Sequence, residues 1–184
     1  MVTSPETLAT VGDTVITTAD VRRRVQRIRA EAGPDAFPVE DSGEDRRLRR
    51  WVVHSLVDEA VIGAEAARLG LIGHAADEPA GAAVLAVFEA VTAGVTVDED
   101  AIGRYYARNT DRYRRPQIGS TGRTATVTVP LEAARDAIAD DLLAAERGRC
   151  FDAWLGERRA ALATVAAGHE HPGDPRAAGS RHRH

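Results

Sequence analysis

Apolar residues recur at helical spacing along most of the chain, and this pattern predicts five helices. Three are long, over residues 18–32, 45–69 and 130–165, and two are shorter, over residues 77–93 and 96–108. The segment 45–69 carries two apolar stripes instead of one, which predicts a helix buried on more than one side. We therefore expect this helix to be the centre of the fold.

Residues with β-propensity occur in only two short places. Residues 8–17 contain two such pieces around the turn pair Gly12-Asp13, which favours a hairpin or a bend. Residues 125–129 form the second β-prone run, after a segment rich in Gly, Ser and Thr. The pattern thus predicts a mainly α fold with a small N-terminal β element and a long C-terminal helix, in a single domain over residues 1–168.

Composition indicates in which compartment the protein works and which classes of partner it does not bind. A net charge of -4 and a pI near 5.9 argue against general binding to nucleic acid or to an anionic membrane. Cys150 is the only cysteine, so no internal disulfide can form. The start of the chain lacks the features of a secretory signal, and no apolar run reaches membrane-spanning length. We therefore expect a cytoplasmic protein.

Several segments resemble, in the same order, the helical chaperone part of SurA and PrsA-type foldases, the PpiC-type family. They are the strand-turn run Val11-Gly-Asp-Thr-Val-Ile-Thr17, the helix His54–Leu71 with its Leu-Val-Asp-Glu core, the stretch from Val97-Asp-Glu-Asp100 through Tyr105-Tyr106 to Pro116, and the returning helix from Leu131 to Leu155. In the family a parvulin prolyl-isomerase domain lies between the last two. Here residues 117–129 form only a short connection, too short for such a domain. The resemblance thus implies a SurA-like helical cradle for extended or unfolded polypeptide, without isomerase activity.

A tyrosine-rich segment is a candidate ligand-binding site. Tyrosine joins an apolar ring to a polar hydroxyl, so these side chains could line a groove that stacks on and hydrogen-bonds to a ligand. The alternative is that they fix the short helix 96–108 against the longer ones. The candidate residues are Tyr105, Tyr106, Asn109, Arg112 and Tyr113.

Two further groups of residues could carry chemistry. His54 and Asp58 lie four residues apart on the central helix, where they could form a catalytic base with its carboxylate, or a surface contact. The tail, residues 169–184, contains two His-x-His pairs that could bind a divalent transition metal, or could simply be solvated. The candidate metal ligands are His169, His171, His182 and His184.

These observations leave two main functional hypotheses. The first is a binding protein without isomerase activity that holds a peptide or a protein partner in the cytoplasm. The second is an enzyme, or an essential enzyme subunit, of an actinobacterial-type natural-product pathway, which would use the histidine-rich tail or the pair His54 and Asp58. Either protein could form a homo- or hetero-oligomer.

Overall fold

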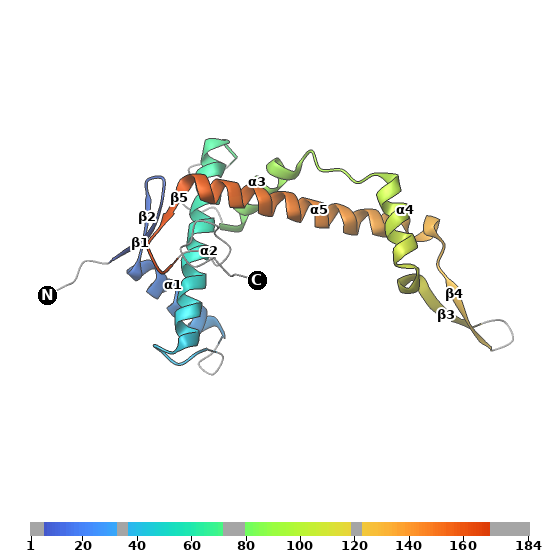
Figure 1. The fold of residues 1–184 in the computed structure, drawn as a ribbon, viewed down its shortest axis with the longest axis horizontal. Coiled ribbons are helices and arrows are strands. Elements are labelled where there is room, and N and C mark those ends of the chain that lie inside the picture. The colour runs from blue at the N-terminus through green and yellow to red at the C-terminus, as the bar shows by residue number, and fades with distance from the viewer. Residues whose placement is uncertain (1–5, 33–36, 72–79, 119–122, 170–184) are drawn as a thin grey trace, which may run out of the picture. The chain divides into compact units, whose positions relative to one another are not determined.

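A computed structural model describes residues 6–32, 37–71, 80–118 and 123–169 of the chain (Figure 1). The fold is mainly α, as predicted. Its helices are α1 (Thr18–Ala32), α2 (Gly43–Arg68), α3 (Ala80–Thr92), α4 (Glu99–Arg108) and α5 (Leu131–Leu162). Its strands are β1 (Thr7–Val11), β2 (Thr14–Thr17), β3 (Arg114–Ile118), β4 (Thr124–Thr128) and β5 (Ala163–Val165), and a 3₁₀ turn, η2 (Thr110–Tyr113), precedes β3.

The chain divides into two compact units. One unit joins Met1–Phe88 with Trp154–His184, and the other is the continuous segment Glu89–Ala153. Helices α3 and α5 each contribute residues to both units. The division does not test the expectation of a single domain over residues 1–168, which stays a prediction.

The first unit packs a small sheet against α1 and α2. The sheet has the strand order β2-β1-β5 and is antiparallel throughout, so the last strand pairs with the first, with Ala9 opposite Val165 (Figure 1). Helix α2 buries several valines completely against this sheet and against α1: Val52, Val53, Val57 and Val61. Burial on two sides of α2 agrees with the two apolar stripes of its sequence. None of the helices in the described residues is long and apolar enough to cross a membrane.

The second unit has a smaller core where α4 meets the first half of α5. Its buried side chains are Ile102, Ala134 and Ile138, and several half-buried residues pack around them. Asp98 caps α4, because its carboxylate accepts a hydrogen bond from the Ala101 amide at 2.5 Å. The sequence had predicted a helix from residue 96, so α4 begins slightly later than expected, at Glu99.

Two elements differ from the sequence-based expectation. Residues 163–165, expected to end the last helix, form strand β5, because Thr164 and Val165 are β-branched and pair with β1. The segment 109–115, for which no regular element was predicted, contains η2 and the start of β3, which forms an antiparallel hairpin with β4. The short connection that follows Pro116 is thus part of a β-hairpin.

Candidate functional site

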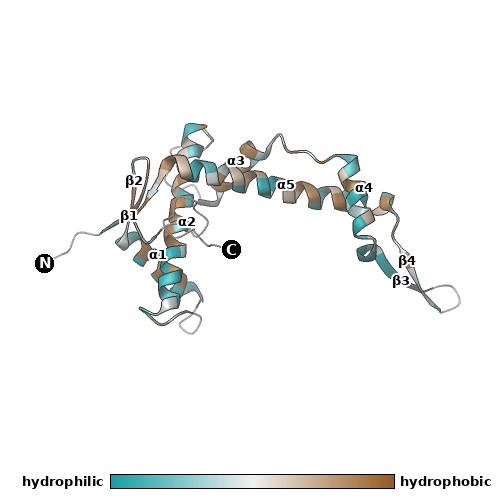
Figure 2. Ribbon diagram, in the orientation of Figure 1, coloured by the Kyte–Doolittle hydropathy of each residue, from teal (hydrophilic) through white to brown (hydrophobic). Residues whose placement is uncertain are grey.

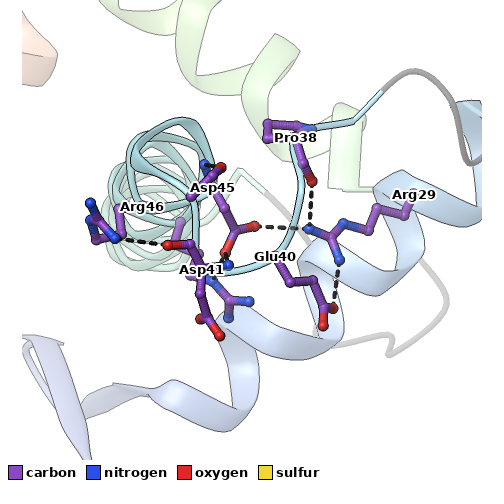
Figure 3. A network of polar contacts seen from close by, with 8 residues as sticks. Arg29, Pro38, Glu40, Asp41, Asp45 and Arg46 are labelled. Atoms are coloured by element: carbon purple, nitrogen blue, oxygen red, sulfur yellow. Dashed lines mark hydrogen bonds and ion pairs between the residues drawn. The ribbon is translucent and has the colours of Figure 1, made fainter.

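A buried carboxylate organises the junction of α1 and α2 in the first unit (Figure 3). Asp45 lies in the first turn of α2 and is fully buried. Its two oxygens accept hydrogen bonds from Arg29 of α1 at 2.8 Å, from Arg49 of α2 at 2.7 Å and from the Asp41 amide at 3.3 Å. The bond from Arg49 is the main cause that holds the pKa of Asp45 below its ordinary value, and the Asp41 amide adds to it. The carboxylate is therefore charged at neutral pH.

Arg29 extends this network to the loop that precedes α2. The guanidinium also donates to Glu40 at 2.7 Å and to the Pro38 carbonyl at 3.4 Å (Figure 3). Ser42 caps α2, because its hydroxyl accepts a hydrogen bond from the Asp45 amide. One aspartate thus links a helix cap, a loop and a neighbouring helix.

A polar cavity of about 530 Å³ lies beside this network. Its walls come from α1, from the loop before α2 and from the first turns of α2: Arg22, Val25, Gln26, Arg29, Glu40, Asp41 and Arg49. The lining contains three arginines and two acids, and the neighbouring Asp45 adds a third acid, so the charges balance and the wall favours neither an anion nor a cation. This cavity was not predicted from the sequence, although Ser42 followed three residues later by Asp45 is a recognisable helix-start signal.

The proposed catalytic pair also lies on α2, further along this helix than the residue that lines the cavity. His54 is buried, with 8% of its surface exposed, whereas Asp58 is half-buried. The Asp58 carboxylate accepts a hydrogen bond from Arg159 of α5 at 2.8 Å, so it joins these two helices within the first unit. A structural role of Asp58 in this ion pair accounts for its position, and the catalytic role of the pair stays a prediction.

The five candidate residues of the tyrosine-rich segment do come together, in the second unit. The rings of Tyr106 and Tyr113 lie 5.0 Å apart and pack against the core around Ile138. Burial is the main cause that raises the pKa of Tyr113. The Tyr106 hydroxyl donates to the Val129 carbonyl at 2.7 Å, which ties α4 to the segment that leads into α5. This geometry favours the structural alternative for Tyr106 and Tyr113.

The remaining members of this group are held by local contacts. Asn109 ends α4, and its side-chain amide donates to the Tyr105 carbonyl at 2.8 Å. Arg112 donates to the Tyr105 hydroxyl at 2.6 Å in an exposed position. Tyr105 and Arg112 are therefore the two members that keep a polar group at the surface.

Tyr106→Phe is expected to lower the free energy of unfolding by about 1 kcal/mol, because the carbonyl of the half-buried Val129 loses its donor. Tyr105→Phe is the matched control, since it removes a hydroxyl bonded only to an exposed arginine, and should cost less than about 0.5 kcal/mol. Urea unfolding followed by circular dichroism measures both values. Equal, small losses would argue that the Tyr106 hydroxyl serves a ligand instead.

The predicted metal ligands are only partly within the described residues. His169 is half-buried, and its backbone amide donates to the Ala166 carbonyl at 3.1 Å. His171, His182 and His184 lie outside the described residues. Within the described part of the chain, no group of three or more His, Cys, Asp or Glu residues could hold a metal ion. The half-buried Cys150 lies on α5, with its sulfur 4.0 Å from the Val91 carbonyl oxygen.

The β3–β4 hairpin is the most exposed element of the second unit. All ten of its strand residues are exposed, and the described residues place only these two strands in its sheet. A hydrogen bond of 2.8 Å from the Val129 amide to the Tyr113 carbonyl closes the base of the hairpin. A two-stranded hairpin with both faces in water is only marginally stable by itself. The hydrogen bond at its base, and the packing of Tyr113 against the core around Ile138, therefore hold the hairpin in place.

The register shows which backbone groups of the hairpin point outward. Antiparallel pairs alternate between hydrogen-bonded and non-hydrogen-bonded, and the pair Tyr113–Val129 is hydrogen-bonded. By this alternation the amides and carbonyls of Thr124, Thr126 and Thr128 point away from β3. We call these outward groups the β4 edge. On the opposite side Pro116 has no amide hydrogen, so the outer edge of β3 lacks its central donor.

A comparison with models of protein families found no match to this chain, and a comparison with curated proteins found none either. The structure itself defines the class: a mainly α protein of two compact units with an exposed β-hairpin.

Proposed function

We propose that this chain is a binding protein without isomerase activity that holds an extended segment of a peptide or a protein partner. The observation that carries the proposal is the β4 edge. Every second residue of this fully exposed strand, Thr124, Thr126 and Thr128, directs its amide and carbonyl outward. An extended segment can add to such an edge as a third strand through main-chain hydrogen bonds. Binding of this kind depends little on side chains, so it suits a protein that accepts varied segments.

The energetics of the hairpin support this proposal. Natural proteins usually cover or interrupt an open strand edge, because it invites pairing with other chains. Here Pro116 interrupts β3, whereas β4 consists of Thr, Ala and Val and keeps all its donors. A third strand would also stabilise the two-stranded ladder. The side that is left open is thus the one best suited to receive a strand.

The resemblance to SurA and PrsA-type foldases adds to the proposal. The resemblance implies that the hairpin stands between the two segments that flank the parvulin domain in those proteins. We therefore propose a SurA-like helical protein in which a strand-binding hairpin stands in place of the isomerase, acting on a cytoplasmic partner. Prolyl isomerase activity is not part of the proposal.

The test compares the full chain with a variant whose hairpin is shortened. Replacing residues 116–126 by Asn-Gly joins Arg115 to Val127 through a two-residue turn and keeps the closed base. We expect the full chain to bind a reduced, carboxymethylated, permanently unfolded protein, and the shortened variant to lose at least about tenfold in affinity as the edge's hydrogen bonds are lost. Fluorescence anisotropy measures the binding.

Two controls make this result decisive. Circular dichroism and thermal unfolding should show that the shortened variant keeps its helices, and the same probe protein in its native, folded form should not bind. Equal binding by the full chain and the shortened variant would overturn the role of the hairpin. The absence of any binding to the unfolded probe would overturn the proposed function itself.

A further inference from the structure

We infer that the segment bound at the β4 edge is acidic; this inference rests on the proposed function and specifies the chemistry of its partner. The observation behind it is the distribution of charge. Residues 104–128 contain six arginines and only one acid, Asp111, whereas the whole chain has a net charge of -4. The hairpin and its approach from α4 are thus a basic region in an acidic protein.

The arginines of the hairpin are exposed and available to a partner. Arg114, Arg115 and Arg123 are all exposed, and β3 is mainly hydrophilic (Figure 2). Arg114 lies 3.1 Å from the exposed Asp111. Among the described residues, neither Arg115 nor Arg123 forms an ion pair. These two side chains can therefore pair with carboxylates of an incoming segment without giving up an existing partner.

The geometry places these charges within reach of an added strand. Neighbouring strands lie about 4.8 Å apart, so a strand at the β4 edge would lie about 10 Å from β3. The residues of β4 between them are small, and Arg123 directly precedes β4 itself. An extended arginine side chain and a glutamate side chain together span this distance. The distance is also close to the Debye screening length at physiological salt, so the charges still attract each other.

Both faces of the hairpin carry positive charge. In the register Arg114 lies opposite Thr128 and Arg115 lies opposite Val127, so the two arginines lie on opposite faces. Acidic side chains on either face of an added strand would therefore meet an arginine. A segment that alternates acidic and β-branched residues fits this arrangement best, since the β-branched residues favour the extended conformation.

Two other occupants fit the hairpin less well, one because of its charge and the other because of its chemistry. A second copy of this chain would bring two basic hairpins together, and like charges oppose that pairing. A single-stranded nucleic acid would satisfy the arginines but not the outward amides and carbonyls. Neither β3 nor β4 has an aromatic side chain on which bases could stack. An acidic polypeptide satisfies both the charge and the strand edge.

The experiment titrates the full chain into two fluorescein-labelled heptapeptides at 150 mM salt. One has the sequence Thr-Glu-Val-Glu-Thr-Glu-Val, and the other has glutamine in place of each glutamate. We expect the acidic peptide to bind at least about fivefold more tightly, and its advantage to shrink at 500 mM salt. Binding of both peptides with equal affinity would overturn the inference while leaving the proposed function intact.

A pair of charge variants tests the arginines directly. Arg115→Gln with Arg123→Gln should weaken binding of the acidic peptide about fivefold and leave the glutamine peptide unchanged. The matched control is Arg47→Gln with Arg50→Gln, which removes the same charge from exposed positions on α2 in the other unit. An equal loss in both double variants would show that only net charge matters, which would contradict a site at the hairpin.

A pair of variants at one position tests the strand edge. Thr126→Pro removes an outward amide hydrogen but no β3–β4 hydrogen bond, because Thr126 and Pro116 form a non-hydrogen-bonded pair. We expect about tenfold weaker binding of the acidic peptide by Thr126→Pro and no change for Thr126→Ala. Undiminished binding by Thr126→Pro would overturn pairing at the β4 edge.

Two further arms test the other occupants. Tighter binding of a single-stranded dT oligonucleotide than of the acidic peptide would overturn the inference in favour of nucleic acid. Concentration-dependent dimerisation that Thr126→Pro abolishes, measured by analytical ultracentrifugation, would overturn it in favour of a second copy. No binding of either peptide, together with no binding of the unfolded probe protein, would remove the proposed function as well.

Discussion

Asp45→Ala is expected to lower the free energy of unfolding by about 3 kcal/mol, because it leaves two arginines without the buried carboxylate that they share. We take the lower part of the range for a broken buried ion pair, since Arg29 and Arg49 are themselves partly exposed. The substitution also removes the acceptor of the Asp41 amide. Urea unfolding followed by circular dichroism measures the change.

Glu40→Gln is the matched control for this prediction. Glu40 pairs with the same guanidinium of Arg29, at 2.7 Å, but its side chain is 74% exposed. Exposed ion pairs contribute little, so we expect a loss of about 0.5 kcal/mol or less. If Asp45→Ala costs no more than Glu40→Gln, then the buried network does not hold α1 to α2.

The same carboxylate makes stability depend on pH. Its folded-state pKa lies below the ordinary value of 3.8, so its stabilisation is complete above that value and is lost as the pH falls through the folded pKa. Asp45→Asn should therefore show a smaller loss of stability than the unmodified protein between pH 5 and pH 3. Part of the acid dependence should remain, because the pKa values of Asp20 and Glu59 are lowered too.

Ile138→Ala is expected to destabilise the second unit by about 3 kcal/mol, because Ile138 is 1% exposed at the centre of a small core. Ile118→Ala is the matched control in the same unit, since Ile118 is 74% exposed on β3. The control should change the free energy of unfolding by less than about 0.5 kcal/mol. Chemical denaturation gives both values, and equal effects would show that the core around Ile138 is not closely packed.

The helices could be predicted from sequence because their signals are local. The apolar repeat of α2 and the breakers at its ends place this helix to within two residues. Its inner and outer faces were harder to assign. Trp51 belongs to one of the two apolar stripes yet is 59% exposed, whereas the neighbouring Val52 and Val53 are fully buried. Periodicity alone does not say which stripe meets the sheet.

The parts that escaped prediction depend on contacts between distant residues. Arg29 and Asp45 are sixteen residues apart and belong to different helices, so their ion pair has no signal in either segment. Strand β5 pairs with β1 from the other end of the described chain. The hairpin was predicted only in its second strand, because Arg114, Arg115 and Pro116 lack the composition of a strand.

The order of the units along the chain has a consequence for synthesis. The segment Glu89–Ala153 is continuous, so all its contacts can form as soon as it has left the ribosome. The sheet of the other unit lacks β5 until the residues after 162 have been made, and the closing loop then spans almost the whole described chain. We therefore expect the inserted segment to fold during translation, before the other unit can complete its sheet with β5.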